Sequence, residues 1–229
     1  MSATIIPQLV KKDFMLTRTM IGVFCLVSLA GVVAISLLFG RLPEWALVNL
    51  AFLLLMSPAA TCGMVLLMVT VVFEKEKSTQ AFIMSLPVTP KQFTIAKLVI
   101  NLGVFGVFWL VISGIAFYFA FGRGFFPAGT IPFVVMVLLG AFVAYAGILS
   151  VSLWRQSLGL TVLAIAVFEM GTSAYLWVIV YLDPIARFIH GPEMVWNSTA
   201  IGIVVIQALA AVAMLSAALI HQSRKRDFV

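Results

Sequence analysis

Charged side chains are scarce in this sequence. Of its 229 residues, 10% are Asp, Glu, Lys or Arg and 63% are hydrophobic, whereas about a quarter of the residues in an ordinary globular domain are charged. The mean hydropathy is +1.19. These values exclude an ordinary soluble domain and indicate an integral membrane protein.

Cysteine and histidine are also rare. Cys25 and Cys62 each lie inside an apolar run, so neither a disulfide framework nor a cysteine metal cluster is available, and we expect both to be small core residues. The histidines are His190 and His221. They fall on opposite faces of the membrane in the topology predicted below, so they cannot act together.

Catalytic motifs are missing as well. The sequence has no G-x-S-x-G, no H-E-x-x-H, no close pair of aspartates, and no Gly-Lys pair of the kind that a phosphate-binding loop needs. We therefore predict no catalytic residue, no metal site and no cofactor in this chain. ATP hydrolysis by the chain alone is not expected.

Long uncharged runs are what the sequence has in abundance. A run of about 20 apolar residues spans the roughly 30 Å hydrocarbon core of a bilayer. The runs predict an all-α membrane protein, with residues 1–229 forming one transmembrane domain. Its six predicted spans are residues 20–39, 46–73, 94–121, 131–153, 159–182 and 199–220.

The N-terminal residues 4–18 predict a helix that lies in the membrane interface. Ile6, Leu9, Val10 and Phe14 recur at helical spacing, and the charged Lys11, Lys12 and Asp13 are expected on the opposite side. A disordered basic tail is the alternative. For the first span the alternative is a signal peptide, since Ser28-Leu29-Ala30 resembles a cleavage site, but the apolar run continues past it.

The basic residues predict the orientation. Six spans place both termini on one side, and taking that side as cytoplasmic leaves only Arg41, Arg123 and Arg187 of the 14 Lys and Arg outside. Basic residues in short loops resist translocation. We therefore expect cytoplasmic termini in a multi-pass protein of a prokaryotic cell membrane, and the net charge of +6 reflects topology rather than nucleic-acid binding.

The segment Phe73 to Lys97 is the longest break in the membrane pattern and carries four lysines. A charged run, Glu74, Lys75, Glu76 and Lys77, precedes apolar residues that include Phe82 and Leu86, and Pro87 then stops the pattern. This predicts an amphipathic helix over residues 74–86. Such a helix suits force transmission from a soluble partner, although a solvated turn with snorkelling lysines has the same composition.

The next helix has a clear start. Thr89 is a good N-cap, Pro90 suits the first helical position, and Gln92 completes a Thr-x-x-Gln capping box. On the opposite side of the membrane, residues 183–198 form the longest outer loop, which we interpret as a plain connector rather than the cap of a vestibule. Its sequon, Asn197-Ser198-Thr199, abuts the membrane and carries little weight.

Polar residues inside the spans are the remaining candidates for function. Glu169 is the one carboxylate predicted deep in a span, and it is expected to face a cavity, a partner or a proton, or to be a protonated packing residue. Pro58 is expected to bend span two and free a carbonyl. Small residues that favour close helix contact are Ala59, Ala60 and Gly63 on span two and Gly140, Ala144 and Gly147 on span four.

Taken together, these features resemble the permease subunits of ABC exporters, in the type-two permease family whose architecture is shared with ABCG-like exporters. The resemblance covers essentially the whole chain: the N-terminal KKDFMLTR, six spans, and the segment FEKEKSTQAFIMSLPVTPKQFTIAKLV. It implies that residues 4–18 are the connecting helix and that residues 74–86 are a coupling helix that docks on a separate ATPase subunit. The short outer loop is a departure and leaves the outer gate undefined.

The resemblance also implies the assembly and the site residues. Two permease chains, identical or paralogous, would pair with two ATPase subunits that bind ATP and Mg. The implied coupling residues are Glu74, Lys75, Glu76, Lys77, Phe82 and Leu86. The implied pathway residues are Asn49, Phe52, Met56, Ser57 and Thr61 of span two with Glu169 and Thr172 of span five.

Two other functions stay open. One is a self-contained, proton-linked secondary transporter that uses Glu169. The other is an intramembrane enzyme, which the missing catalytic motifs argue against, or an assembly scaffold. For the exporter, a pathway lined by Phe, Met and Ser suggests a hydrophobic or amphipathic cargo such as a drug, lipid or peptide.

Overall fold

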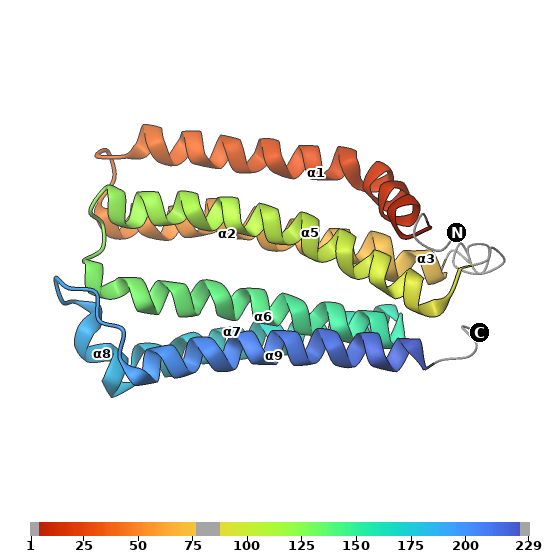
Figure 1. The fold of residues 1–229 in the computed structure, drawn as a ribbon. Coiled ribbons are helices and arrows are strands. Elements are labelled where there is room, and N and C mark those ends of the chain that lie inside the picture. Colours follow the sequence, from red (N-terminus) through yellow and green to blue (C-terminus); the bar gives the residue numbers. More distant parts are fainter. Residues whose placement is uncertain (1–4, 77–87, 225–229) are drawn as a thin grey trace. The chain divides into compact units, whose positions relative to one another are not determined.

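The computed structural model describes residues 5–76 and 88–224, and over these ranges it is all-helical with no strand (Figure 1). Among the described residues, six helical segments are long and apolar enough to cross a membrane. Each overlaps one predicted span, which confirms the prediction of a multi-pass, all-α membrane protein. Of the predicted coupling helix, Lys77, Phe82 and Leu86 lie outside the described residues.

The helices follow one another along the chain with short connections. The membrane-length segments are α1 (Ile5–Leu38), α2 (Glu44–Leu67) continued by the π-helix η2 (Met68–Val72) and α3 (Phe73–Glu76), α5 (Pro90–Phe117) continued by η3 (Tyr118–Gly122), the 3₁₀ turn η4 (Ala128–Thr130) leading into α6 (Ile131–Arg155), α7 (Leu158–Val180) and α9 (Ser198–Ser223). A short helix, α8 (Asp183–Ile189), lies between α7 and α9.

The chain divides into two compact units. Unit 1 is Met1–Thr70 with Ile95–Phe125, and unit 2 is Val71–Thr94 with Phe126–Val229. Unit 1 therefore contains α1, α2 and most of α5, and unit 2 contains α6 to α9. Each unit is described by itself below.

In unit 1, α1 joins the predicted interfacial helix and the first span into one continuous helix. The ribbon changes direction near its N-terminal end (Figure 1). In the N-terminal half of α1, the hydroxyl of Thr17 donates to the carbonyl of Asp13, 2.8 Å away. Such a bond to the preceding turn competes with the backbone ladder and bends helices, so the amphipathic and apolar parts differ in direction without a break.

Packing between α1 and α2 depends on one glycine and one proline. Pro58 has no N–H to donate to the carbonyl of Leu54, four residues earlier in α2. Gly31 of α1 faces that carbonyl so closely that an added Cβ would lie 2.9 Å from its oxygen. The backbone of α1 can approach the freed carbonyl because position 31 has no side chain, so Pro58 and Gly31 act as a matched pair.

The start of α5 is built as the sequence predicts. The backbone N–H of Thr89 donates to Gln92 Oε1 at 2.9 Å, and the N–H of Gln92 donates to Thr89 Oγ1 at 3.3 Å. This reciprocal pair confirms the capping box and satisfies two donors that a helix start leaves open. The hydrogen bonds between Thr89 and Gln92 therefore fix the backbone at the point where α5 begins.

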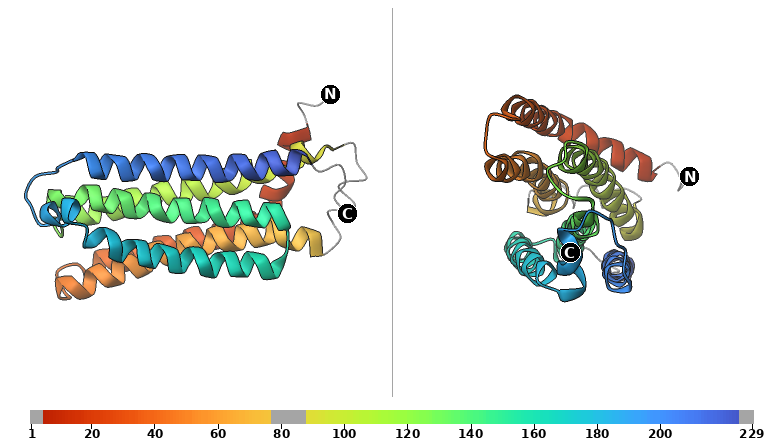
Figure 2. Two further views of the ribbon diagram at one scale, coloured as in Figure 1. Left: turned by 90° about the horizontal axis from the view of Figure 1, so that it is seen from below. Right: turned by 90° about the vertical axis from the view of Figure 1, so that its left-hand side faces the viewer.

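In unit 2, α6 packs against both α7 and α9 (Figure 2). Two buried glutamines of α9 donate to backbone carbonyls of α6: Gln207 to Met136 at 3.0 Å, and Gln222 to Leu153 and, at 3.2 Å, to Trp154. The earlier glutamine, Gln207, bonds the earlier carbonyl, and the later one, Gln222, bonds the later carbonyls. The helices α6 and α9 are therefore parallel, and these bonds hold them together near each end.

The connection between α7 and α9, residues 183–198, was predicted to be a plain connector, and that prediction was wrong. It contains α8, whose Ile185 and Ile189 are buried in a cluster with Met136, Ile179 and Ala200. Thr130 donates to the carbonyl of Ile189 at 2.7 Å. Asn197 caps α9 by accepting from the N–H of Ala200 at 2.8 Å. These contacts pack α8 against the end of unit 2 where α7 ends and α9 begins.

We predict that Gly31→Ala weakens unit 1. The new methyl would meet a backbone oxygen at 2.9 Å, which cannot move without shifting α2, and such overpacking costs about 1–3 kcal/mol. The measurement is the free energy of unfolding of the purified protein in mixed micelles. Gly22→Ala on the same helix is the control, because no atom lies within 4 Å of its added Cβ. Equal stability of the two variants would contradict the close contact.

Candidate functional site

A buried ion pair links α1 to α5 in unit 1. Lys97 Nζ donates to Asp13 Oδ2 at 2.7 Å, and the two side chains are 2% and 0% exposed. The other carboxylate oxygen of Asp13 lies 3.1 Å from Lys12 Nζ, whose side chain is 39% exposed. The carboxylate thus has a fully buried cation on one side and a partly hydrated one on the other.

The ion pair continues into a network that reaches α2. Asn101 Nδ2 donates to the carbonyl of Lys97 and to Thr70 Oγ1, each at 2.9 Å. Thr70 lies in the π-helix η2 and donates to the carbonyl of Leu66 at 2.8 Å. We call Asp13, Lys97, Asn101 and Thr70 the polar clasp, since together they connect all three helices of unit 1.

The polar clasp lies next to the predicted coupling segment along the chain. Thr70 precedes residues 74–86 and Lys97 follows them. Among the predicted coupling residues that the structure describes, Glu74 is buried and Lys75 is exposed. A partner that docks here would therefore meet Lys75 more readily than Glu74.

The sequence predicted part of this arrangement and missed part of it. Asp13 was expected on a polar surface beside Lys11 and Lys12, and that is wrong because its carboxylate is buried against Lys97. A signal for Lys97 was present: it shares a helical face with Phe93 and Ile100, both buried. Cys62 is buried as predicted, whereas Cys25 is exposed, so the prediction for Cys25 was wrong.

The predicted pathway residues of span two lie on α2. Asn49, Phe52, Ser57 and Thr61 are exposed in the single chain, whereas Met56 is buried. The amide of Asn49 donates to the carbonyl of Trp45, and the hydroxyl of Thr61 to that of Ser57, each at 2.8 Å. Backbone carbonyls one turn earlier therefore satisfy these donors.

The predicted pathway residues of span five lie at the middle of α7. Glu169 is exposed in the single chain and makes no hydrogen bond or ion pair with a described residue. Thr172 is partly buried and donates to the carbonyl of Phe168 at 2.8 Å. Because α2 belongs to unit 1 and α7 to unit 2, the proximity of the two sets stays a prediction.

Unit 2 also contains a cleft that the sequence did not predict. It has a volume of about 340 Å³ and is lined by Gly140, Val143, Ala144, Val167, Phe168, Gly171, Thr172, Tyr175 and Gln207. Of the predicted pathway residues only Thr172 contributes to it, together with Gly140 and Ala144, two of the small residues singled out on span four. The small residues of span four are confirmed as contact positions, because an added Cβ at Gly147 would lie 2.2 Å from the Phe168 ring.

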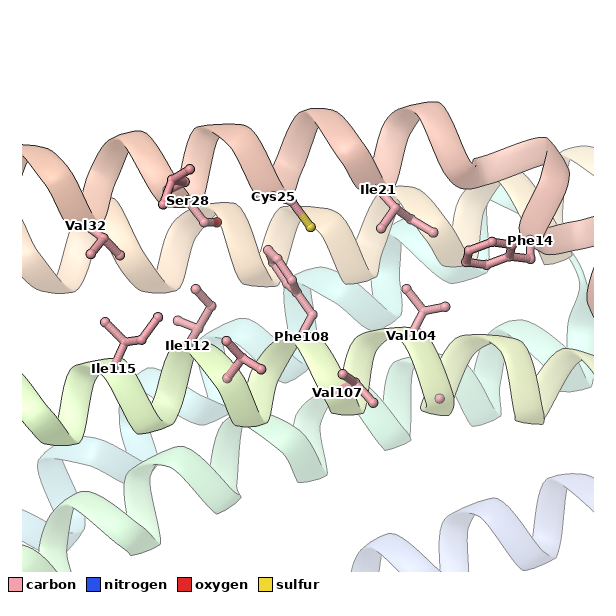
Figure 3. Close-up of a pocket in the computed structure, with 13 residues that line it drawn as sticks. Phe14, Ile21, Cys25, Ser28, Val32, Val104, Val107, Phe108, Ile112 and Ile115 are labelled. Carbon is pink, nitrogen blue, oxygen red and sulfur yellow. The ribbon is translucent and has the colours of Figure 1, made fainter.

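A second, larger cleft runs between α1 and α5 in unit 1 (Figure 3). Its volume is about 570 Å³. Figure 3 shows Ile21 and Cys25 of α1 opposite Val104, Phe108 and Ile112 of α5. Nearly all of the lining is apolar, so this cleft can accommodate hydrocarbon but supports no acid–base chemistry.

Comparison with protein-family models, with curated proteins and with solved structures found no match to this chain. Within residues 5–76 and 88–224, no group of three His, Cys, Asp or Glu side chains is placed to hold a metal ion.

We predict that Asp13→Asn and Lys97→Met each destabilise the protein strongly. Asp13→Asn leaves the buried ammonium of Lys97 without this counter-ion, which costs about 3–5 kcal/mol. Lys97→Met leaves the Asp13 carboxylate with only the partly exposed Lys12, 3.1 Å away. The double variant should lose much less than the sum, and a double-mutant cycle on the free energy of unfolding in micelles measures the difference. Lys91→Met is the control, since Lys91 is exposed in the first turn of α5. Additive losses would show that the pair is not coupled.

Proposed function

We propose that this chain is the membrane-spanning permease subunit of an ABC exporter. It forms the substrate pathway in the cell membrane and couples it to ATP hydrolysis by a separate ATPase subunit. The observation that carries the proposal is the polar clasp, which binds three membrane helices together and whose residues flank, along the chain, the segment that resembles a coupling helix. The six spans and the lack of a phosphate-binding loop are consistent with this role.

The polar clasp gives the proposal a physical basis. A partner that pushes on the predicted coupling helix, residues 74–86, acts on the chain between α2 and α5. Lys97 and Asn101 of α5 are bonded to Asp13 of α1 and Thr70 of η2. Breaking buried charge-assisted bonds is expensive, so we expect displacement of the segment to move the three helix ends together rather than separate them.

Exposed polar groups at membrane depth support a second permease chain. A central acidic residue costs about 2.5–3.5 kcal/mol on insertion scales, yet Glu169 is exposed on α7, and Asn49, Ser57 and Thr61 are exposed on α2. In a bilayer these faces would be covered by a partner chain or line a hydrated pathway. An assembly of two permease chains with two ATPase subunits would provide the partner chain and the hydrated pathway.

ATP then acts through the conformations of the assembly. Binding of ATP would clamp the two ATPase subunits together and move the coupling segments, which switches the pathway between inward and outward access. The drive is the differential affinity of ATP for the two states. The permease chain performs no bond chemistry in this scheme.

We expect a tagged chain, purified in mild detergent, to recover a stoichiometric ABC ATPase subunit with ATPase activity. Lys75→Glu and Phe82→Asp should each lower the recovered ATPase about tenfold, which corresponds to roughly 1.4 kcal/mol of binding free energy. Lys75 is preferred to Glu74 because Glu74 is buried. Arg187→Glu, an exposed charge reversal in α8, is the control. A clean and inactive eluate from cells that express such ATPases would reject the exporter.

A proton-linked secondary transporter is the second candidate, favoured by the exposed position of Glu169 alone. If the exporter proposal holds, the chain reconstituted without an ATPase should show no transport driven by a pH gradient, and Glu169→Gln should not change this. Gradient-driven uptake by the chain alone, abolished in Glu169→Gln, would replace the exporter with the secondary transporter.

A further inference from the structure

The cleft of unit 2 lies between α6 and α7, and Gln207 of α9 also lines it. Its volume of about 340 Å³ falls at the small end of the range of about 300–1,000 Å³ that is usual for small-molecule sites. None of its nine lining residues is charged. The cleft is thus suited to a compact, uncharged molecule.

Two glycines give this cleft its shape. An added Cβ at Gly140 would lie 2.9 Å from Tyr175 Cε1 and 3.1 Å from Gln207 Nε2, so the absence of a side chain there lets both polar side chains approach α6. On the opposite wall, no atom lies within 4 Å of the Cβ position of Gly171. One glycine therefore positions the polar groups, and the other leaves space beside them.

Every donor among the polar side chains of the cleft is already used. Gln207 Nε2 donates to the carbonyl of Met136 at 3.0 Å and to Tyr175 Oη at 2.5 Å. Tyr175 Oη donates to the same Met136 carbonyl at 3.3 Å. Thr172 Oγ1 donates to the carbonyl of Phe168 at 2.8 Å.

The acceptors are not used up. Gln207 is 7% exposed, and its Oε1 atom accepts no hydrogen bond from any residue within 5–76 and 88–224. The hydroxyl oxygen of Thr172 retains acceptor capacity, whereas that of Tyr175 already accepts from Gln207 Nε2. A buried acceptor without a donor costs about 1–3 kcal/mol. Gln207 lines the cleft, and its Oε1 is closed to solvent in this structure, so a ligand donor reaches this unused acceptor when the amide turns toward the cleft.

We propose that this cleft binds an uncharged, mostly apolar molecule that carries a hydrogen-bond donor, a hydroxyl or an N–H, and that the donor bonds Gln207 Oε1. The surplus of acceptors selects the donor, and the uncharged lining selects against ions. The inference deepens the proposed export function by naming a cargo class, and it rests on that function only for the step from binding to export. A lipid acyl chain has no donor and is the rival occupant.

Two probes of the same shape separate these occupants. Carbazole has three fused rings and one N–H, and dibenzofuran has the same rings with an ether oxygen in its place. Binding of each is measured to the full chain in lipid nanodiscs, with binding to empty nanodiscs subtracted to remove partition into lipid. We expect carbazole to bind about fivefold more tightly, in line with one net hydrogen bond. Equal binding of the two probes, or none above empty nanodiscs, overturns the proposal.

Variants then locate the site. Gln207→Leu should reduce carbazole binding to the level of dibenzofuran. Its control is Gln222→Leu, which removes a second buried α9 amide that also donates to α6 carbonyls but lies outside the cleft. Gly171→Leu should block both probes, whereas Gly202→Leu, also in open space, should block neither. If Gln222→Leu weakens carbazole as much as Gln207→Leu, or if Gly171→Leu leaves binding intact, the assignment to this cleft is wrong.

The binding measurement uses no ATPase, so its outcome is separate from that of the pull-down. Donor-selective binding without a recovered ATPase would keep the site and reject the exporter. A recovered ATPase without donor-selective binding would keep the exporter and reject the site.

Discussion

Polar groups that enter a membrane must find their partners inside the protein, and this requirement accounts for most of what is specific in the structure. The hydrocarbon core offers no water to donate or accept hydrogen bonds. The buried pair of Asp13 and Lys97, at 2.7 Å, is the strongest instance. Two charges removed from water need each other, so the positions of α1 and α5 in unit 1 are tied to one contact.

The same requirement explains the rest of the packing. Asn101 bridges α5 to the π-helix at the end of α2, and Gln207 and Gln222 fasten α9 to α6 at two levels. Pro58 leaves the carbonyl of Leu54 without its helical donor, and Gly31 of the neighbouring helix α1 lies against that carbonyl. Helix association here relies on polar bonds and close backbone contact, since apolar side chains pack against lipid as readily as against each other.

Groups that this requirement leaves unsatisfied are the natural candidates for function. Glu169 is exposed at the middle of α7 without a partner among the described residues, and Gln207 Oε1 is buried without a donor. Exposed Glu169 is consistent with contact to another permease chain or with a hydrated pathway. The buried Gln207 Oε1 is consistent with a ligand that carries a hydrogen-bond donor. Both interpretations follow from the same physical cost, although they concern different assemblies and are tested separately.

Much of the fold was predictable because it depends on local sequence. Uncharged runs predicted the six membrane-length helices, and Thr89 and Gln92 predicted the start of α5, since span length and capping involve only neighbouring residues. The candidate site was predictable in part: Glu169 and the polar residues of span two are visible as polar side chains inside apolar runs. The burial of Lys97 could also be predicted, because it shares a helical face with the apolar residues Phe93 and Ile100.

The pairings were not predictable in this way. The sequence by itself determined the membrane class, the number and approximate limits of the spans, and the exceptional character of Glu169. Only the tertiary structure decided that Asp13 pairs with Lys97, that the connection between α7 and α9 folds into α8 over a buried cluster, and that Tyr175 and Gln207 meet next to Gly140. These contacts join residues far apart in the chain, and their geometry depends on how helices pack, which no local pattern of hydrophobicity specifies.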